Sequence, residues 1–413
     1  MRCWYELNAD TRIRVRTSAG VSEATDVGAV VGQGMLGSAL VSQAVLDEGI
    51  SEHFQPGGDT ELQYGKVKIA PLLWQDDFIH GSDCIKKAMK ASCRVNTIIK
   101  ERGLNLNQTK SRCIVIGSRK QKIEASEVMK SGPLKCGEVI IKEEQEIKWL
   151  GQYISSRGLG RSVLINKEAR EGKIKGPCLE IANIIQDWRS QAAGGMDTAL
   201  LLWESCCIPS LLHGAGTWNE ISSTAEARLE ALQHWFLRLI LQIGPGCPLP
   251  SLRWDSGVLA MSLRIWILKV MLVRHLRSME ESTLARQIYE EQKTNNWPGL
   301  AKETKVICQE LGIEDCNETS NSMNNKDYRS MLIESCRKKD EERLRDQAIG
   351  KEKCDKIMLE DYGKKEYMSE QSIDGVRQYF YSRVRMQPFA GNYSKDKRFM
   401  KSNWLCKCGK ECE

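Results

Sequence analysis

The chain has 413 residues, of which 60 are Lys or Arg and 54 are Asp or Glu, with a net charge of +6 and 41% hydrophobic residues. This composition supplies enough apolar side chains for packed cores and excludes wholesale disorder, while the length suggests about two to four domains. The best candidate for a membrane span, residues 258–273, is interrupted by Arg264 and Lys269, so we expect no membrane span and no membrane partner.

The first 15 residues lack the apolar segment of a signal peptide and carry charges throughout, including Arg2, Glu6 and Asp10. We therefore expect an intracellular protein, in the nucleus, the cytoplasm or both. Because these compartments are reducing, the 16 cysteines are predicted to be mostly free thiols.

Residues 11–17 alternate in side-chain type and predict a β-strand with Arg12, Arg14 and Arg16 on one face. Along a strand, alternate side chains lie about 7 Å apart, which is close to the spacing of successive phosphates on an extended nucleic-acid strand. The three arginines are therefore candidates for binding a nucleic-acid backbone. A solvated edge strand is the alternative.

A glycine-rich segment, residues 28–37, leads into a predicted helix over residues 35–49. Glycines ahead of a helix let the backbone approach a flat or anionic ligand closely, and Gln33 beside Gly34 can both donate and accept hydrogen bonds. The spacing of the glycines does not match the dinucleotide-binding fingerprint. An ordinary glycine-rich turn is the alternative.

The predicted strand over residues 66–73 leads into two adjacent carboxylates, Asp76 and Asp77, flanked by apolar and aromatic side chains. Successive side chains of a strand face opposite sides, so only one of the two can face a given site. A two-metal site for phosphoryl transfer needs at least one further carboxylate, supplied by another strand. The alternative is that the pair forms a solvated hairpin turn.

A helix is predicted over residues 82–100, closed by Gly103, and a tight turn then leads into a strand over residues 112–116. The turn presents Lys110 beside the sheet. It is either a surface lysine or a group that clamps, or donates a proton to, a developing pyrophosphate.

Residues 138–154 predict further strands, with a hairpin around residues 143–144. Beyond them the pattern becomes helical, and a run rich in Pro and Gly, residues 243–250, predicts a break. Long helices are predicted over residues 162–188, 196–211, 224–243 and 258–292. The tryptophans of this region predict a core of its own, with a base-stacking platform as the alternative. They are Trp203, Trp218, Trp235, Trp254 and Trp266.

The C-terminal part begins with a polar linker over residues 316–325. Residues 337–356 mix 14 charged side chains of both signs and predict a solvated helix, with a phosphate-binding face as the alternative. Near the end of the chain, Cys406, Cys408 and Cys412 have some metal-ligand character. A tetrahedral zinc site needs four ligands and no His follows, so we expect an incomplete, unliganded site.

The order of these segments resembles the reverse transcriptase of non-LTR (LINE-type) retrotransposons. The Gly-Gln-Gly of residues 32–34 resembles motif B, which contacts template and nucleotide, so Gln33 and Gly34 would take that role. The Trp-Gln-Asp-Asp of residues 74–77 resembles the aromatic-x-Asp-Asp box of motif C, with Trp in place of the usual Phe or Tyr.

Later segments extend the resemblance. Residues 107–110 resemble motif D, which would include Lys110. Residues 148–155 are similar to the primer grip, which implies that Trp149, Leu150 and Gly151 contact the primer.

The resemblance covers most of residues 1–300 and implies an α+β fold. A partial right-hand polymerase palm, an antiparallel sheet with packed helices, is expected over residues 1–160. A helical thumb would follow over 161–295, then a charged helical region over 296–400 and a truncated Cys knuckle over 401–413.

The implied activity is RNA-directed DNA polymerisation, with an RNA template, a DNA primer and deoxynucleotides as partners. Asp76 would be the metal ligand, for Mg²⁺ or in its place Mn²⁺, with Asp77 supporting it and Lys110 assisting the chemistry. A Zn²⁺ ion at the C-terminal cysteines is not expected.

In this family a first catalytic Asp precedes motif B, and the 31 residues before Gly32 contain no matching Asp on a predicted strand. We therefore expect the chain to be the later part of a larger enzyme, with weak or no polymerase activity alone. A non-catalytic relic that binds nucleic acid is the first alternative. A helical interaction protein that binds no nucleic acid is the second.

Overall fold

The computed structural model of the chain describes residues 12–14, 16–17, 20–26, 38–54, 61–74, 77–186, 195–218, 221–244, 246–317, 323–351, 354, 357–369 and 373–384. The chain divides into two compact units, Met1–Arg157 and Gly158–Glu413. The architecture is mixed α and β, which agrees with the predicted α+β class: the first unit combines helices with short strands, and all described elements of the second unit are helices.

The described elements of the first unit are β1 (Arg12–Ile13), β2 (Arg16–Thr17), β3 (Gly20–Val21), β4 (Thr25–Asp26), α2 (Ser38–His53), β5 (Leu62–Tyr64), β6 (Val67–Ile69), β7 (Leu72–Trp74), β8 (Asp77–Ile79), α3 (Ile85–Glu101), β9 (Arg112–Cys113), α4 (Arg119–Ser131), β10 (Lys135–Cys136), β11 (Val139–Ile140), β12 (Lys142–Glu143), β13 (Glu146–Trp149) and β14 (Gln152–Ser155).

The described strands of this unit pair two by two and do not join into a larger sheet. The pairs β1–β4, β2–β3, β5–β6, β7–β8, β10–β11 and β13–β14 are antiparallel, and β9–β12 is parallel. The described residues therefore form separate strand pairs, and the single antiparallel sheet expected for a partial polymerase palm is absent from them.

The strand expected over residues 11–17 is interrupted. Ile13 pairs with Thr25 and Arg16 pairs with Val21, so two residues on one side oppose three on the other. One extra residue breaks the ladder of backbone hydrogen bonds, as in a β-bulge. The arginines therefore belong to two short strands, with Arg14 between them.

Helix α3 ends as its sequence predicts. Gly103 has φ +64°, and its N–H donates to the carbonyl of Lys100, while Leu104 N–H donates to Ile99. A left-handed glycine just after the last turn satisfies carbonyls that have no partner inside the helix.

The described elements of the second unit are α5 (Leu159–Gln186), α6 (Gly195–Leu202), the π-helix η1 (Trp203–Cys207), α7 (Ile208–Leu211), the 3₁₀ helix η2 (Ala215–Thr217), α8 (Ser223–Leu241), α9 (Leu249–Ser256), α10 (Met261–Ser278), α11 (Leu284–Thr294), α12 (Leu300–Leu311), α13 (Asn325–Ala348), the 3₁₀ helices η3 (Ile357–Leu359) and η4 (Glu366–Ser369), and α15 (Ile373–Arg383).

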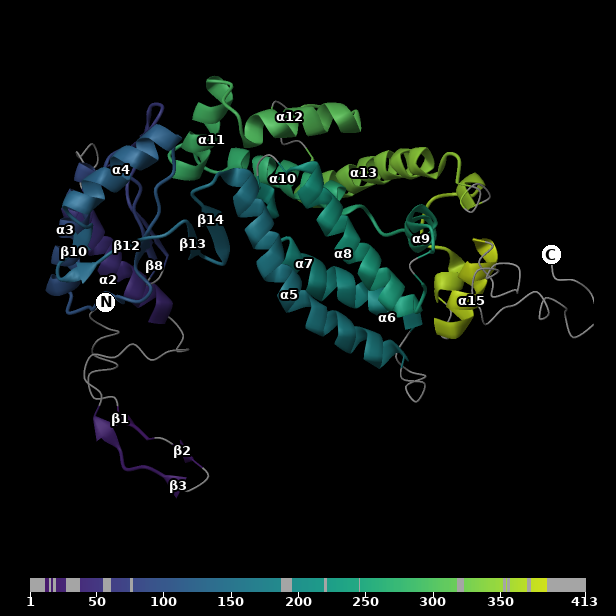
Figure 1. Ribbon diagram of the computed structural model, residues 1–413, viewed down its shortest axis with the longest axis horizontal. Helices are drawn as coiled ribbons and strands as arrows, with labels where there is room; N and C mark the ends of the chain where they lie inside the picture. Colours follow the sequence, from purple (N-terminus) through teal and green to yellow (C-terminus); the bar gives the residue numbers. More distant parts are fainter. Residues whose placement is uncertain are drawn as a thin grey trace, which may run out of the picture. The chain divides into compact units, whose positions relative to one another are not determined.

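The larger core of this unit lies among α5 to α9 and the C-terminal helices, and Figure 1 shows α5 and α8, in teal, running side by side. The rings of Trp203 and Phe236 stack inside it with centroids 4.3 Å apart. Trp218 and Trp254 are also buried, so the predicted tryptophan core is confirmed. Trp235 packs against the same core.

A second apolar cluster joins α10 to α11, α12 and α13, and Trp266 packs against it. The helix expected over residues 258–292 is two helices, because the chain leaves α10 after Ser278 and α11 begins at Leu284. The predicted break over residues 243–250 ends earlier than expected. Helix α9 begins at Leu249 with a proline in its first turn, where the missing N–H costs no hydrogen bond.

The charged segment over residues 337–356 is not entirely the solvated helix that its composition predicts. Asp340 of α13 is completely buried and accepts hydrogen bonds from Arg253 Nη2 (2.5 Å), Ala260 N–H (3.1 Å) and the Tyr362 hydroxyl (3.0 Å). A buried carboxylate requires such partners, and here they come from distant parts of the chain.

None of the described helices is by itself long and apolar enough to cross a membrane. Helices α9 and α10 together reach that length and composition, with a bend of 51° between them.

Candidate functional site

The hairpin β7–β8 carries the predicted catalytic segment. Leu73 pairs with Phe78, and both pack against the small core that α2 and α3 form around Phe54. Alternate residues of a strand face opposite sides, so the pair Trp74 and Asp77 faces away from that core. Accordingly, Trp74 is 57% exposed and the Asp77 carboxylate is accessible.

The two residues between these strands, one of which is Asp76, lie outside the described residues. Asp77 is the first residue of β8 and stands directly across the hairpin from Trp74. Its carboxylate therefore lies at the turn end of a hairpin whose opposite face is anchored on two helices, which is a fixed and accessible position for a charged group.

Two groups of three side chains in the described residues are close enough to share a metal ion, and Asp77 belongs to neither. One of them, in the first unit, consists of Glu52, His53 and Glu101. His53 Nε2 lies 3.0 Å from Glu101 Oε2, and Arg102 Nη2 lies 3.0 Å from Glu52 Oε2. The Arg102 guanidinium neutralises the charge of the Glu52 carboxylate. We therefore interpret these ion pairs as contacts that join α2 to α3.

Lys110 lies in the tight turn that its sequence predicts. Asn107 Oδ1 accepts hydrogen bonds from the N–H groups of Thr109 and Lys110, both at 3.1 Å, which closes an Asx-type turn. The Lys110 side chain is exposed, and no hydrogen bond or ion pair joins it to Asp77 among the described residues. The turn leads into β9, where Arg112 Nε lies 2.5 Å from Glu144 Oε1.

The predicted primer-grip residues form the end of a second hairpin. β13 pairs with β14, with Trp149 opposite Gln152, so Leu150 and Gly151 form a two-residue loop. Their φ angles are +46° and +76°, which is typical of the type I′ turn that matches the twist of antiparallel strands. The hairpin expected around residues 143–144 is therefore wrong, because β12, which includes Glu143, pairs in parallel with β9.

Trp149 of β13 places its indole N–H in a buried position. Its Nε1 is buried and makes no hydrogen bond within the described residues, and an unsatisfied buried donor costs about 1–3 kcal/mol. On the same hairpin, Lys148 Nζ lies 5.7 Å from the centre of the Tyr153 ring.

Cys113 of β9 pairs with Glu143 of β12. Burial, assisted by the charge of Glu143, raises the pKa of Cys113, which keeps this thiol protonated.

The remaining predicted site residues are only partly described. Arg14 is exposed between β1 and β2, while Arg12 and Arg16 are described in their backbone alone. Further predicted residues lie outside the described residues, and these are Gln33, Gly34, Cys406, Cys408 and Cys412.

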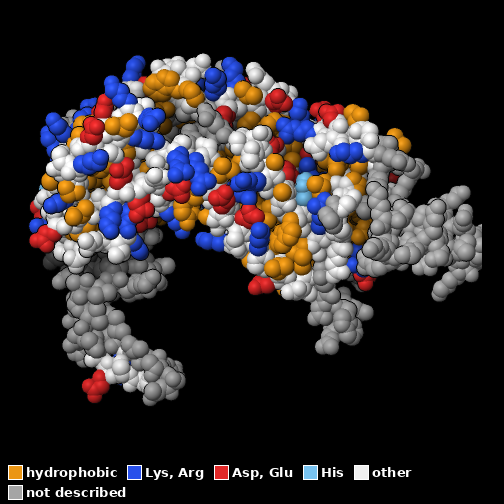
Figure 2. Space-filling model, viewed as in Figure 1, with side chains coloured by type: hydrophobic (Ala, Val, Ile, Leu, Met, Phe, Trp, Pro, Cys, Tyr) orange, Lys and Arg blue, Asp and Glu red, His pale blue; other side chains and the backbone are white. Residues whose placement is uncertain are grey.

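Charge on the visible surface is mixed. Figure 2 shows Lys and Arg side chains interspersed with Asp and Glu, without one continuous basic tract on the face drawn. This distribution agrees with the small net charge of +6. Nucleic-acid binding would therefore depend on local groups of basic side chains rather than on the charge of the whole chain.

Sequence reasoning missed the second group of metal-ligand type, Cys308, Asp315 and Cys316 in the second unit. The sequence does contain a signal for this group. Cys308 and Cys316 are only 8 residues apart, and Asp315 directly precedes Cys316.

No protein-family model matches the chain, and no curated protein matches it. The resemblance to reverse transcriptases therefore stays a prediction from the order of the motifs.

Proposed function

We propose that the chain is part of the reverse transcriptase of a LINE-type retrotransposon and that it binds an RNA template paired with a DNA primer. The observation that carries the proposal is the hairpin β7–β8, with Asp77 accessible at its turn end beside Trp74. In the family that the sequence resembles, motif C supplies carboxylates that hold the catalytic metal ions, and an accessible Asp77 is compatible with that role.

The second hairpin adds support. Leu150 and Gly151 form a tight turn at the position in the motif order where a primer grip is expected. A rigid two-residue turn can approach a nucleic-acid backbone closely, because no bulky loop stands in the way. Helix α3 contributes Ala91 and Ile98 to the small core against which β7–β8 packs.

Nucleotidyl transfer by this class of enzyme requires Mg²⁺ held by carboxylates from more than one strand. The described residues supply Asp77 but no set of oxygen ligands around it, so they do not by themselves form a Mg²⁺ site. Asp76, the expected metal ligand, lies outside the described residues. The second candidate function is that the 413-residue chain binds the hybrid without extending the primer.

Binding is tested with the purified chain and a fluorescently labelled RNA–DNA hybrid, measured by anisotropy over a salt series. Replacing Arg12, Arg14 and Arg16 together with Ala should weaken binding and lower the slope of log affinity against log salt by about 2–3. The matched control replaces the exposed Lys302, Lys305 and Lys338, which removes the same charge from the second unit and should leave the slope unchanged.

Catalysis is tested by primer extension with Mg²⁺ and with Mn²⁺. We expect little or no incorporation by residues 1–413, and hybrid affinity that Asp76→Ala leaves unchanged. Template-dependent incorporation that Asp76→Ala abolishes would instead show that the chain is an active polymerase. Absence of any hybrid binding at about 50 mM salt would reject both candidates, since electrostatic contacts are strongest at low salt.

A further inference from the structure

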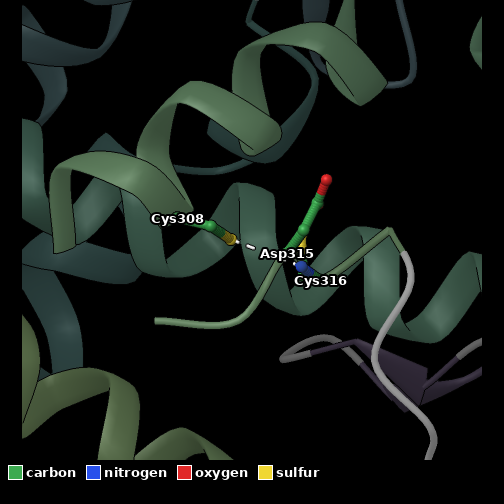
Figure 3. Close-up of side chains that lie close together, drawn as sticks. All are labelled: Cys308, Asp315 and Cys316. Atoms are coloured by element: carbon green, nitrogen blue, oxygen red, sulfur yellow. Dashed lines mark hydrogen bonds between the residues drawn. The ribbon is translucent and has the colours of Figure 1, made fainter. Parts of the chain in front are cut away.

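The C-terminal end of α12 and the segment after it bring two cysteines and an aspartate together in the second unit. Cys308 lies in the last turn of α12, and the left-handed Gly312 (φ +63°) ends the helix. The chain then folds back, so that the N–H of Cys316 donates to Cys308 Sγ at 3.5 Å. Figure 3 shows this contact, with Asp315 beside it.

The three potential ligand atoms, two sulfurs and a carboxylate oxygen, all lie within 4.8 Å of one another. Cys308 is 1% exposed and Cys316 is 3% exposed, whereas Asp315 is half-buried. Such spacing is compatible with one small cation between the three, since zinc–sulfur bonds are about 2.3 Å long and zinc–oxygen bonds about 2.0–2.2 Å.

Neighbouring groups hold these ligands in place. Asp315 Oδ1 accepts hydrogen bonds from both the N–H (2.9 Å) and the side-chain Nδ2 (2.5 Å) of Asn317. Asn317 is in turn fixed from α11, because its Oδ1 accepts from the Tyr289 hydroxyl at 2.6 Å and its carbonyl from Lys293 Nζ at 2.8 Å. The carbonyl of Cys316 accepts from Arg277 Nη1 of α10 at 2.6 Å.

We propose that Cys308, Asp315 and Cys316 form a binding site for a thiophilic divalent cation of the Zn²⁺ class. Two thiolates and one carboxylate suit this class and not Mg²⁺ or Ca²⁺, which prefer oxygen ligands alone. On binding, the two S–H protons pass to solvent and two metal–sulfur bonds and one metal–oxygen bond form, with a water molecule as fourth ligand and no change in oxidation state.

The site would join the ends of three helices. Its ligands come from α12 and the segment after it, and the groups that orient them come from α10 and α11. The cation would thus connect α12 to the segment that follows it, within the second apolar cluster, to which Cys308 and Cys316 belong. Orienting hydrogen bonds of this kind are typical of metal sites in proteins.

The chain provides its own comparison. Cys178 of α5 and Cys207 of η1 are also buried, with sulfurs 3.9 Å apart, but they belong to no group of three potential ligands among the described residues. A buried thiol pair alone supplies only two ligands. We therefore expect this pair to remain free of metal under the same conditions.

The test uses the full chain, reduced and freed of metal, titrated with Co²⁺ and followed by the absorption of thiolate–Co²⁺ charge transfer. One equivalent of Co²⁺ should give this absorption, and Zn²⁺ should abolish it by displacement. Cys308→Ser and Cys316→Ser should each remove the signal. Asn317→Ala, which frees the Asp315 carboxylate, should weaken Zn²⁺ affinity by about 10–100-fold.

Two control variants locate the signal, with circular dichroism to confirm that each variant folds. Cys178→Ser should leave the Co²⁺ absorption unchanged, and so should Cys408→Ser, which disrupts the cysteines near the end of the chain. The proposal is overturned if the reduced wild-type chain gives no thiolate–Co²⁺ absorption. It is equally overturned if folded Cys308→Ser protein keeps the signal or if Cys408→Ser removes it.

Discussion

His234 lies on α8 with its ring largely buried. Burial lowers the pKa of His234 to about 4, and the positive charges of Arg253 and Arg238 act in the same direction. Its Nε2 is buried without a hydrogen-bond partner among the described residues. The folded second unit therefore holds this histidine neutral at pH values where an exposed histidine would be protonated.

Folding stability should consequently fall in mild acid. An unfolded chain takes up the proton near pH 6.5 and the folded chain only near pH 4, so the contribution of His234 is complete above pH 6.5 and is lost as the pH falls towards 4. Between pH 7 and pH 5 we expect this residue to account for about 2 kcal/mol of lost stability.

The measurement is urea unfolding of the wild type and His234→Gln at both pH values. The drop in unfolding free energy should be smaller in the variant by that amount, since titrating carboxylates affect both proteins equally. His213→Gln replaces an exposed histidine of the same unit and should behave like the wild type. Equal drops for His234→Gln and the wild type would contradict the expectation.

For single residues, the sequence predicted burial correctly where the size and polarity of the side chain alone decide it. Trp203 and Trp254 are so large and apolar that burial was the best prediction, and both are buried. Asp340 was out of reach, because its environment depends on Arg253, which is 87 residues away in the chain. Likewise, the contact between Cys308 and Cys316 could not be predicted, because it depends on the turn that follows α12.

At the scale of elements, the turn after α9 leaves no space for a side chain at Gly257. Gly257 ends this helix with φ +64°, and a Cβ there would lie 2.5 Å from the backbone nitrogen of Lys364 and 3.1 Å from the carbonyl carbon of Gly363. A left-handed conformation alone costs an alanine about 1 kcal/mol of unfolding free energy. Gly257→Ala should cost more than this, because the added Cβ also clashes with the backbone. We expect a loss of more than about 2 kcal/mol in unfolding free energy.

Gly312→Ala is the matched comparison. It has nearly the same backbone conformation, φ +63°, but its added Cβ would meet nothing within 4 Å. In chemical denaturation it should lose only about 1 kcal/mol. Losses of equal size in the two variants would contradict this expectation, and would show that the backbone of residues 363–364 can move away from the Cβ added at residue 257.

Elements were predictable when their signal was local. The end of α3 at Gly103 follows from a single glycine. Helix α4 was not predicted, although its sequence contains a capping box, in which Ser118 and Gln121 form reciprocal hydrogen bonds. The hairpin at Leu150 and Gly151 was misplaced because a non-glycine residue with positive φ gives little warning in sequence. Parallel pairing of β9 with β12 is likewise a non-local choice.

At the scale of the whole molecule, the chain consists of two units with separate apolar cores. The core of the first unit is small, whereas the second has two extensive clusters. Buried apolar area is the main source of folding free energy, so the second unit should be the more stable of the two.

Residues 158–413 expressed alone should accordingly fold and unfold cooperatively. Their thermal midpoint should lie within a few degrees of the upper transition of the full chain, because every residue of the two apolar clusters belongs to this unit. Calorimetry of both proteins is the measurement. A fragment that shows no transition would mean that the second unit depends on the first for its fold.

The π-helix η1 has a consequence for comparing this chain with any relative. Ile208 N–H donates to Trp203 carbonyl, five residues back, so this turn holds one residue more than the α-helical turns before and after it. A relative with a continuous α-helix here would be one residue shorter between Leu202 and Ile208. An ungapped alignment across η1 would then shift every later position by one and pair Cys207 with the wrong residue. An alignment with such a relative should therefore contain a single-residue gap inside residues 203–207.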